Sequence, residues 1–234
     1  MIRNVLLDLD DTIFDFKACE RLALSVALRS FGIAFLPEDL SDYSLINDGM
    51  WKRFEKGEIT RGELMIKRFE IFLARYDASV SPTEFADGYM QALSKTDVLI
   101  DGAEDVLRIL SEKYDLYAVT NGYERTQMGR IRRSGIDRYF KEIFISERVG
   151  AVKPNKDFFD YCAQQIPDFS IEETVLIGDS PTSDIRGGNA YGLYTIRYNP
   201  ASLPNPSDAI PDREIRSLTE LPTLLCQLSA RKGS

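Results

Sequence analysis

The sequence has no histidine among its 234 residues. This absence excludes Ser-His-Asp and Cys-His relays, a phosphohistidine intermediate, and zinc or haem sites built on histidine ligands. Any general acid or base is therefore a carboxylate, a lysine, a tyrosine or a cysteine. The pH dependence of an activity should follow these groups and the substrate.

Cysteines are few, and long apolar runs are missing. Cys19, Cys162 and Cys226 are far apart and odd in number, so they predict buried, reduced thiols in a reducing compartment rather than a disulfide framework. The apolar run near the N-terminus is interrupted by Asp8, unlike a signal peptide, and no run is long enough to cross a bilayer. We expect a cytoplasmic protein with no membrane partner.

Acidic residues exceed basic ones, 37 to 29, for a net charge of −8. Polymeric nucleic acid and anionic membranes both require clustered Lys and Arg, so neither is an expected partner. Hydrophobic residues make up 44% of the chain, which is enough for a buried core.

Short apolar runs alternate with helical patterns along most of the chain. Strands are predicted at residues 5–9, 114–120, 142–146, 174–178 and 193–198, and helices at 103–113, 124–134, 155–166, 181–191 and 218–228. This alternation predicts an α/β fold with a parallel sheet and a site at the carboxyl ends of its strands. The proline-containing segment after Tyr198 is expected to cross the surface without a strand.

Residues 16–98 have no strand-like run, and their apolar residues recur at helical spacing. We expect a core of residues 1–15 and 99–234, interrupted by a helical cap domain of residues 16–98. An insert that follows the first strand is positioned to act as a lid over the carboxyl end of that strand.

Side chains suited to catalysis lie at or after the ends of four predicted strands. They are Asp8 and Asp10, then Thr120 and Asn121, then Lys153, and finally Asp179 and Asp184. In a parallel sheet these strand ends converge on one edge. Crowded carboxylates need a cation, and a set of oxygen ligands suits Mg²⁺. The expected metal ligands are the side chains of Asp8 and Asp179 and the backbone carbonyl of Asp10.

The spacing of Asp8 and Asp10 predicts a division of roles. Two residues apart on extended backbone, their side chains leave on the same side. We expect Asp8 to attack phosphorus and form an aspartyl-phosphate, and Asp10 to protonate the leaving oxygen and then activate water.

The other strand ends supply binding groups. Thr120 and Asn121 are expected to donate hydrogen bonds to the phosphoryl oxygens. Lys153 should pair with Asp8 and with the phosphate. Asp184 is placed to orient the metal ligands or Lys153 rather than to bind the metal directly.

These residues form four motifs, which resemble in order those of the haloacid dehalogenase superfamily over essentially the whole chain: Asp8-x-Asp10-x-Thr12, Thr120-Asn121, Lys153-Pro154 and Gly178-Asp179-Ser180-x-x-x-Asp184. The resemblance implies a Rossmann-like three-layer core, with the helical insert as a type-1 cap.

A finer resemblance links the chain to the bacterial pyrimidine 5′-nucleotidase branch. It is carried by Tyr43, Asn47, Trp51, Arg68-Phe69 and residues 57–60, 145–150 and 153–155. It implies a Mg²⁺-dependent phosphomonoesterase whose partner is a small phosphorylated metabolite, a nucleoside monophosphate, with pyrimidine ones among the substrates. The protein is expected to be a monomer or a homodimer.

Three alternatives remain open. One is a phosphatase of sugar phosphates or other small phosphometabolites. Another is a 2-haloacid dehalogenase, which uses the same nucleophile but neither Mg²⁺ nor the second acid, so Asp10 and Asp179 argue against it. The third is a non-catalytic binding or regulatory protein. The presence of every expected catalytic residue argues against it.

Several side chains of the insert and of the helix at residues 124–134 also have structural interpretations. Packing in the core is favoured over base stacking for Trp51, Phe54, Phe69 and Phe72. Arg68 is equally consistent with a substrate contact and with a surface ion pair. The basic run at residues 130–133 is predicted to be a solvated helix face.

Overall fold

The computed structural model describes residues 1–76 and 79–231, which form two compact units. The sheet unit comprises Met1–Asp15, Leu99–Glu124 and the described residues from Ser134 on. The helical unit comprises the described residues of Phe16–Val98 together with Arg125–Arg133. Most of one helix, α6 (Glu124–Ser134), thus groups with the helical unit.

The sheet unit is built on six parallel strands in the order β3-β2-β1-β4-β5-β6. The strands are β1 (Asn4–Leu7), β2 (Asp115–Thr120), β3 (Glu142–Ile145), β4 (Thr174–Gly178), β5 (Tyr194–Tyr198) and β6 (Arg213–Ile215). The predicted α/β fold with a parallel sheet is confirmed. The chain leaves β1 for β2 on one side and later returns to β4 on the other, so the strand order reverses between β1 and β4, the place where sheets of this kind bind ligands.

The sixth strand corrects the prediction for the segment after Tyr198. β6 pairs with β5, with Tyr198 opposite Ile215. Of its three residues, Arg213, Glu214 and Ile215, only the last is buried. A short edge strand with two charged residues lacks the apolar run by which the other strands are recognised.

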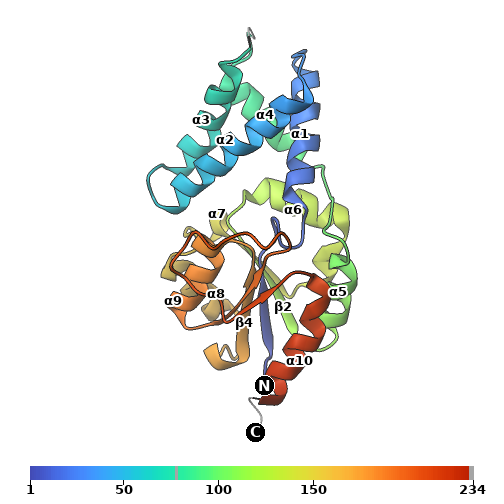
Figure 1. Ribbon diagram of the computed structural model, residues 1–234, viewed down its shortest axis with the longest axis vertical. Coiled ribbons are helices and arrows are strands. Elements are labelled where there is room, and N and C mark those ends of the chain that lie inside the picture. The colour runs from blue at the N-terminus through green and yellow to red at the C-terminus, as the bar shows by residue number, and fades with distance from the viewer. Residues whose placement is uncertain (77–78, 232–234) are drawn as a thin grey trace. The chain divides into compact units, whose positions relative to one another are not determined.

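Helices cover both faces of the sheet, as in a Rossmann-like fold. In Figure 1, α8 and α9 lie on one side of the strands and α5 and α10 on the other. The helices of this unit are α5 (Ala103–Ser111), the short α7 (Ser146–Val149), α8 (Lys156–Gln165), α9 (Arg186–Tyr191) and α10 (Leu221–Arg231). Single turns complete it: η1 (Ile136–Tyr139), η2 (Ile171–Glu173), η3 (Pro181–Ile185, a π-helical turn) and η4 (Leu218–Glu220).

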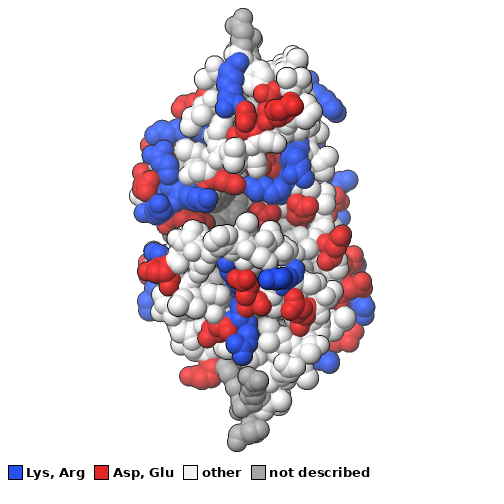
Figure 2. Space-filling view, viewed as in Figure 1, with Lys and Arg blue, Asp and Glu red and all other residues white. Residues whose placement is uncertain are grey.

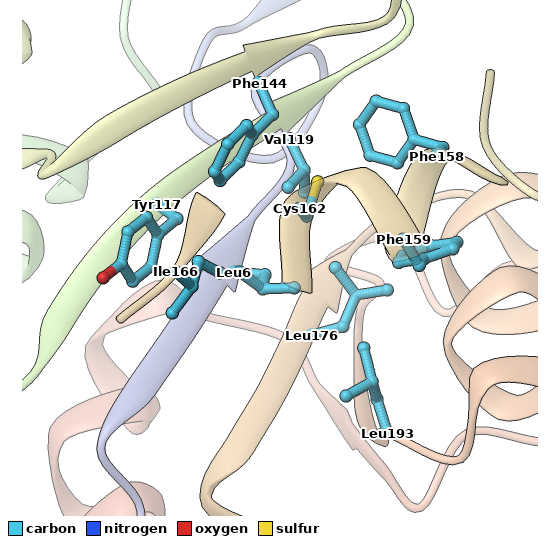
Figure 3. Close-up of a cluster of buried hydrophobic side chains, with 10 residues drawn as sticks. All are labelled: Leu6, Tyr117, Val119, Phe144, Phe158, Phe159, Cys162, Ile166, Leu176 and Leu193. Atoms are coloured by element: carbon cyan, nitrogen blue, oxygen red, sulfur yellow. The ribbon is translucent and has the colours of Figure 1, made fainter. Parts of the chain in front are cut away.

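One face of the central strands packs against α8. The buried cluster in Figure 3 joins side chains of β1 to β4 with side chains of α8, and it includes one residue just after α8 and one just before β5. Its members are Leu6, Tyr117, Val119, Phe144, Phe158, Phe159, Cys162, Ile166, Leu176 and Leu193. Every residue of β1 is buried, as expected for a central parallel strand covered on both faces. This packing fixes the strand ends that carry the candidate site.

Four helices make up most of the helical unit: α1 (Phe16–Ser30), α2 (Pro37–Glu55), α3 (Arg61–Leu73) and α4 (Pro82–Leu93). Capping boxes begin α3 and α4. Thr60 and Ser81 each accept a hydrogen bond from the backbone N–H three residues on, and Glu63 and Glu84 bond back to the N-cap amides.

The core of the helical unit is aromatic. Phe69 and Phe72 are fully buried and pack against Tyr43, so the prediction of core packing is confirmed for both. Phe54 is also buried, whereas Trp51 is only partly so. Arg68 is 2% exposed inside this unit, so it does not form the surface ion pair considered above.

Two further predictions about exposure are right only in part. Arg132 and Arg133 of α6 are exposed as predicted, but Arg130 is fully buried, with its guanidinium carbon 5.7 Å from the ring centroid of Phe16. Cys19 and Cys162 are buried as predicted, but Cys226 is exposed. In both cases tertiary packing decides the burial, and local composition does not reveal it.

Basic and acidic side chains are interspersed on the face shown in Figure 2. Exposed ion pairs, such as that of Lys156 with Asp160, contribute little to stability because solvent screens them. Within residues 1–76 and 79–231, no helix is long and apolar enough to cross a membrane.

Candidate active site

Asp8 lies directly after β1, at the carboxyl edge of the sheet. Its backbone N–H donates to the carbonyl of Ile177 at 2.9 Å, which continues the pairing of β1 with β4 by one residue. The Asp8 residue is 7% exposed. The loop that follows turns at Asp11, whose φ is 58°, and carries Asp10 beside Asp8.

Lys153 joins the end of β1 to the segment after β4. Its ammonium nitrogen lies 2.6 Å from Asp8 Oδ1 and 2.7 Å from Asp184 Oδ1, and it donates a third hydrogen bond to the carbonyl oxygen of Val119 at 2.8 Å. Lys153 and Asp184 are each 1% exposed. The predicted pairing of Lys153 with Asp8 is present, and the carbonyl of Val119 is an acceptor that sequence patterns cannot reveal.

Asn121 holds the backbone of Lys153. Its side-chain amide donates to the carbonyl of Lys153 at 2.9 Å, and its side-chain oxygen accepts from the Lys153 N–H at 2.9 Å. The neighbouring Thr120, at the end of β2, is buried, and its hydroxyl accepts from the N–H of Gly122 at 3.1 Å. Asn121 therefore positions the lysine loop, a role not anticipated from the sequence.

The end of β4 supplies Asp179 and the turn that holds Asp184. The hydroxyl of Thr12 lies 3.3 Å from Asp179 Oδ1, which links the first and last motifs. Asp184 Oδ2 accepts from the N–H of Ser180 at 3.1 Å while its other oxygen holds Lys153. Asp184 is thus fixed at both oxygens and in turn fixes the lysine.

Gly178 is required by the close approach of Asp184. A Cβ at position 178 would lie 2.3 Å from Asp184 Oδ2 and 2.4 Å from its Cγ, far inside contact distance. The structure thereby explains the glycine that precedes Asp179 in the fourth motif.

Gly178→Ala should therefore displace Asp184 and lower the free energy of unfolding by about 1–3 kcal/mol, the usual range for overpacking. Urea unfolding measures the change. Gly49→Ala is the matched control, because nothing lies within 4 Å of its added Cβ on helix α2, and alanine should there be neutral or stabilising. Equal effects of the two substitutions would contradict this packing.

The buried charges perturb one another. Burial raises the pKa of Asp8 to about 8, and the negative charges of Asp184 and, more weakly, Asp10 add to the rise despite the opposing effect of Lys153. Burial also raises the pKa of Asp179, and Asp8 and Asp184 raise it further. For Lys153, burial alone would lower the pKa, but the carboxylates of Asp184 and Asp8 raise it above its ordinary value.

The carboxylates fit a hard divalent cation. Oxygens of Asp8, Asp179 and Asp184 lie within 4.8 Å of one another. Asp184 is committed to Lys153 and Ser180, so Asp8 and Asp179 are the side chains better placed to hold an ion. Their raised pKa values show how unfavourable two negative charges are here without one. An all-oxygen set of this kind suits Mg²⁺.

Comparison with known proteins agrees with this arrangement. The family model described as haloacid dehalogenase-like hydrolase matches residues 2–192. A crystal structure of the HAD-hydrolase YfnB from Bacillus subtilis bound to magnesium superposes with a TM-score of 0.92 at 42% identity, over 96% of this chain and 98% of that one.

Two similar proteins are named pyrimidine 5′-nucleotidases. PynA of Streptococcus pneumoniae is 39% identical over 93% of this chain and 92% of its own. YjjG of Escherichia coli is 31% identical over 95% of this chain and 97% of its own. With the parallel sheet and the four strand-end motifs in place, these matches establish that the chain belongs to the haloacid dehalogenase-like hydrolase family.

Proposed function

We propose that this hydrolase is a Mg²⁺-dependent phosphomonoesterase that uses Asp8 as a nucleophile. The observation that carries the proposal is the buried pairing of Asp8 with Lys153 at 2.6 Å beside the carboxylate of Asp179. A carboxylate held by an ammonium group at a cation-binding edge is suited to attack an anionic phosphoryl group, because the positive charges offset the charge of the substrate.

The reaction takes place in two displacements at phosphorus. An oxygen of Asp8 forms a bond to phosphorus while the bond to the ester oxygen breaks, and Asp10 gives its proton to the leaving alcohol. Asp10 then takes a proton from water, whose oxygen attacks phosphorus and displaces the Asp8 carboxylate. The products are the alcohol and phosphate, and both aspartates return to their starting states.

The other residues of the site bind the phosphoryl group and keep Lys153 in position. The hydroxyl of Thr120 and the amide of Asn121 lie at the end of β2, where they can donate to phosphoryl oxygens, and Asn121 also fixes Lys153. Lys153 offsets the charge that grows in the transition state, and Asp184 keeps its ammonium in place. Mg²⁺ held by Asp8, Asp179 and the Asp10 carbonyl would add positive charge at the phosphate.

We further propose that the substrates are nucleoside 5′-monophosphates, in particular pyrimidine ones. Support comes from the names of PynA and YjjG, which resemble this chain over nearly their whole lengths. Phosphate release should be measured across pyrimidine and purine nucleoside monophosphates, sugar phosphates and p-nitrophenyl phosphate, with 2-chloropropionate as a dehalogenase substrate. A preference for sugar phosphates over every nucleotide would refute the nucleotidase proposal, and chloride release would favour a dehalogenase.

The raised pKa of Asp8 predicts how metal binding depends on pH. In the metal-free protein Asp8 holds a proton up to about pH 8, whereas its reference pKa is 3.8, so stability should fall as pH rises through that interval. A cation binds the ionised form, and its affinity should rise by up to about tenfold per pH unit below 8.

Thermal unfolding with and without Mg²⁺ tests this at about pH 6 and about pH 9, on either side of the Asp8 pKa. The Mg²⁺-induced increase in Tm should be larger at the higher pH, and EDTA should abolish both the increase and phosphate release. An increase that is larger at the lower pH would contradict the assignment of Asp8 as a ligand.

A further inference from the structure

The sheet unit has a surface groove between α9 and the segment that leads from β5 to β6. The volume of the groove is about 590 Å³. Its lining residues are Arg186, Asn189 and Ala190 of α9 and Asp208, Ala209 and Ile210 of the segment. All of them belong to the sheet unit, so the groove is formed without the helical unit.

The groove carries an exposed apolar side chain on an ordered backbone. Ile210 is 77% exposed. Its carbonyl accepts a hydrogen bond from the side-chain amide of Asn189 at 2.8 Å, which ties the segment to α9. Asn205 donates to the carbonyl of Ala209 at 2.6 Å, and the hydroxyl of Ser207 accepts from the Ala209 N–H at 3.1 Å. A side chain held in this way loses less conformational entropy on binding than one on a mobile loop.

The charged residues of the groove are complementary to a second copy of themselves. The guanidinium of Arg186 lies 2.6 Å from Asp208 Oδ1, and these side chains are 50% and 87% exposed. Solvent screens such a pair, so it adds little to the stability of one chain. A guanidinium has several N–H donors and a carboxylate has about four acceptor positions, so both groups can make further bonds. Across a two-fold axis, Arg186 of one copy can face Asp208 of the other.

We propose that this groove binds a second copy of the chain and forms the interface of a symmetric homodimer. A two-fold interface uses the same surface on both subunits, so it requires a patch that carries both charges and an apolar centre. Ile210 of each copy packs into the groove of the other, beside Ala190 and Ala209. The pairs of Arg186 with Asp208 cross between the copies at the rim, and an apolar centre with a polar rim is the usual organisation of an interface.

Analytical ultracentrifugation of the full chain at increasing concentration tests the dimer. The parent protein should reach the mass of two chains and dissociate on dilution. Ile210→Asp should raise the dissociation constant of the dimer by about 30-fold or more, as expected when an interface loses its central anchor. Ile71→Asp is the matched control, because Ile71 lies on α3 of the helical unit and is 49% exposed. Circular dichroism should show that both variants are folded.

Charge reversal identifies the surface. Arg186→Glu leaves each copy with two negative charges at the groove and Asp208→Arg leaves it with two positive ones, so each variant alone should be monomeric. An equimolar mixture of the two should associate again, because opposite charges then meet across the interface. Arg138→Glu is the control, since Arg138 forms an exposed pair with Glu104 of α5, on the other side of the sheet.

Three results would overturn the proposal. The first is a parent protein that stays monomeric up to about 1 mM, which would leave the groove to a different occupant. The second is a dimer that Ile210→Asp does not weaken, which would place the interface elsewhere. The third is a mixture of the two charge variants that does not associate. None of these measurements depends on Mg²⁺ or on phosphate release, so they stand apart from the proposed phosphatase function.

Discussion

Asp8→Asn is expected to reduce kcat for phosphate release by about 10⁴-fold or more, since loss of a nucleophile removes the covalent route altogether. The amide is nearly isosteric but is a poor nucleophile, and it cannot balance the charge of Lys153. The variant should remain folded, because Asp184 still pairs with Lys153 at 2.7 Å. Phosphate release from uridine monophosphate with saturating Mg²⁺ measures the effect.

Asp168→Asn provides the matched control for the same chemical change. Asp168 belongs to the sheet unit, its side chain is 83% exposed and it pairs only with Arg3 among the ion pairs between described residues. Its substitution should leave activity near that of the parent. Parental activity in Asp8→Asn would show that the nucleophile lies elsewhere.

Lys153→Met is expected to have the second largest effect, because it acts on both stability and activity. It leaves Asp8 and Asp184 facing each other in a buried site without their shared cation, a situation that usually costs about 3–5 kcal/mol of unfolding free energy. Phosphate release should be lost as well. Urea unfolding in the presence of EDTA measures the change in unfolding free energy without a metal ion that could compensate for the lost charge.

The reason for the loss can be tested separately. Without the lysine, which lowers the pKa of Asp8, the Asp8 carboxyl should take up a proton more readily, so the stability deficit of Lys153→Met should shrink as pH falls. Lys153→Met with Asp184→Asn should recover part of the stability, because one of the unpaired charges is gone. Lys156→Met, at an exposed lysine, should be nearly neutral. A deficit that is the same at all pH values would contradict the electrostatic explanation.

Much of the sheet unit could be predicted from sequence because its strands are short apolar runs that stop at polar residues. Each of the first five predicted strands agrees with the observed one to within two residues at either end. β6 cannot be predicted in this way, because its single buried residue, Ile215, gives no periodic signal. The order of the strands depends on tertiary pairing, and local patterns do not encode it.

The candidate site shows a similar limit. Spacing along the chain could bring Asp8, Lys153, Asp179 and Asp184 to one edge of the sheet, and the structure places them there. The spacing could not show that the Asn121 side chain hydrogen-bonds to the backbone of Lys153, or that the carbonyl of Val119 accepts a hydrogen bond from the Lys153 ammonium. Those contacts depend on how the loop after α7 folds back over β2, which no local pattern encodes.

In the helical unit, apolar periodicity does not distinguish side chains that pack in the core from side chains that could bind a ligand. Phe69 and Trp51 both fit a helical core pattern, but only Phe69 is fully buried. Arginine is usually a surface residue, but Arg68 lies in the interior. Its guanidinium donates to the side-chain oxygen of Asn47 and lies over the ring of Phe69. Such polar partners come from neighbouring turns and helices, so sequence spacing alone cannot identify them.

The covalent intermediate is the most direct test of the proposed chemistry. Asp10→Asn should slow the attack of water on the intermediate, but formation from p-nitrophenyl phosphate does not need the acid, because p-nitrophenolate leaves without a proton. Brief reaction with the phosphate-labelled ester and Mg²⁺, followed by acid quench, should therefore trap the phosphoryl group on the protein. The account predicts that peptide mass spectrometry finds it on Asp8, that hydroxylamine removes it, and that Asp8→Asn does not acquire it. Phosphate release without any label on Asp8, or label on another residue, would contradict the aspartyl-phosphate mechanism.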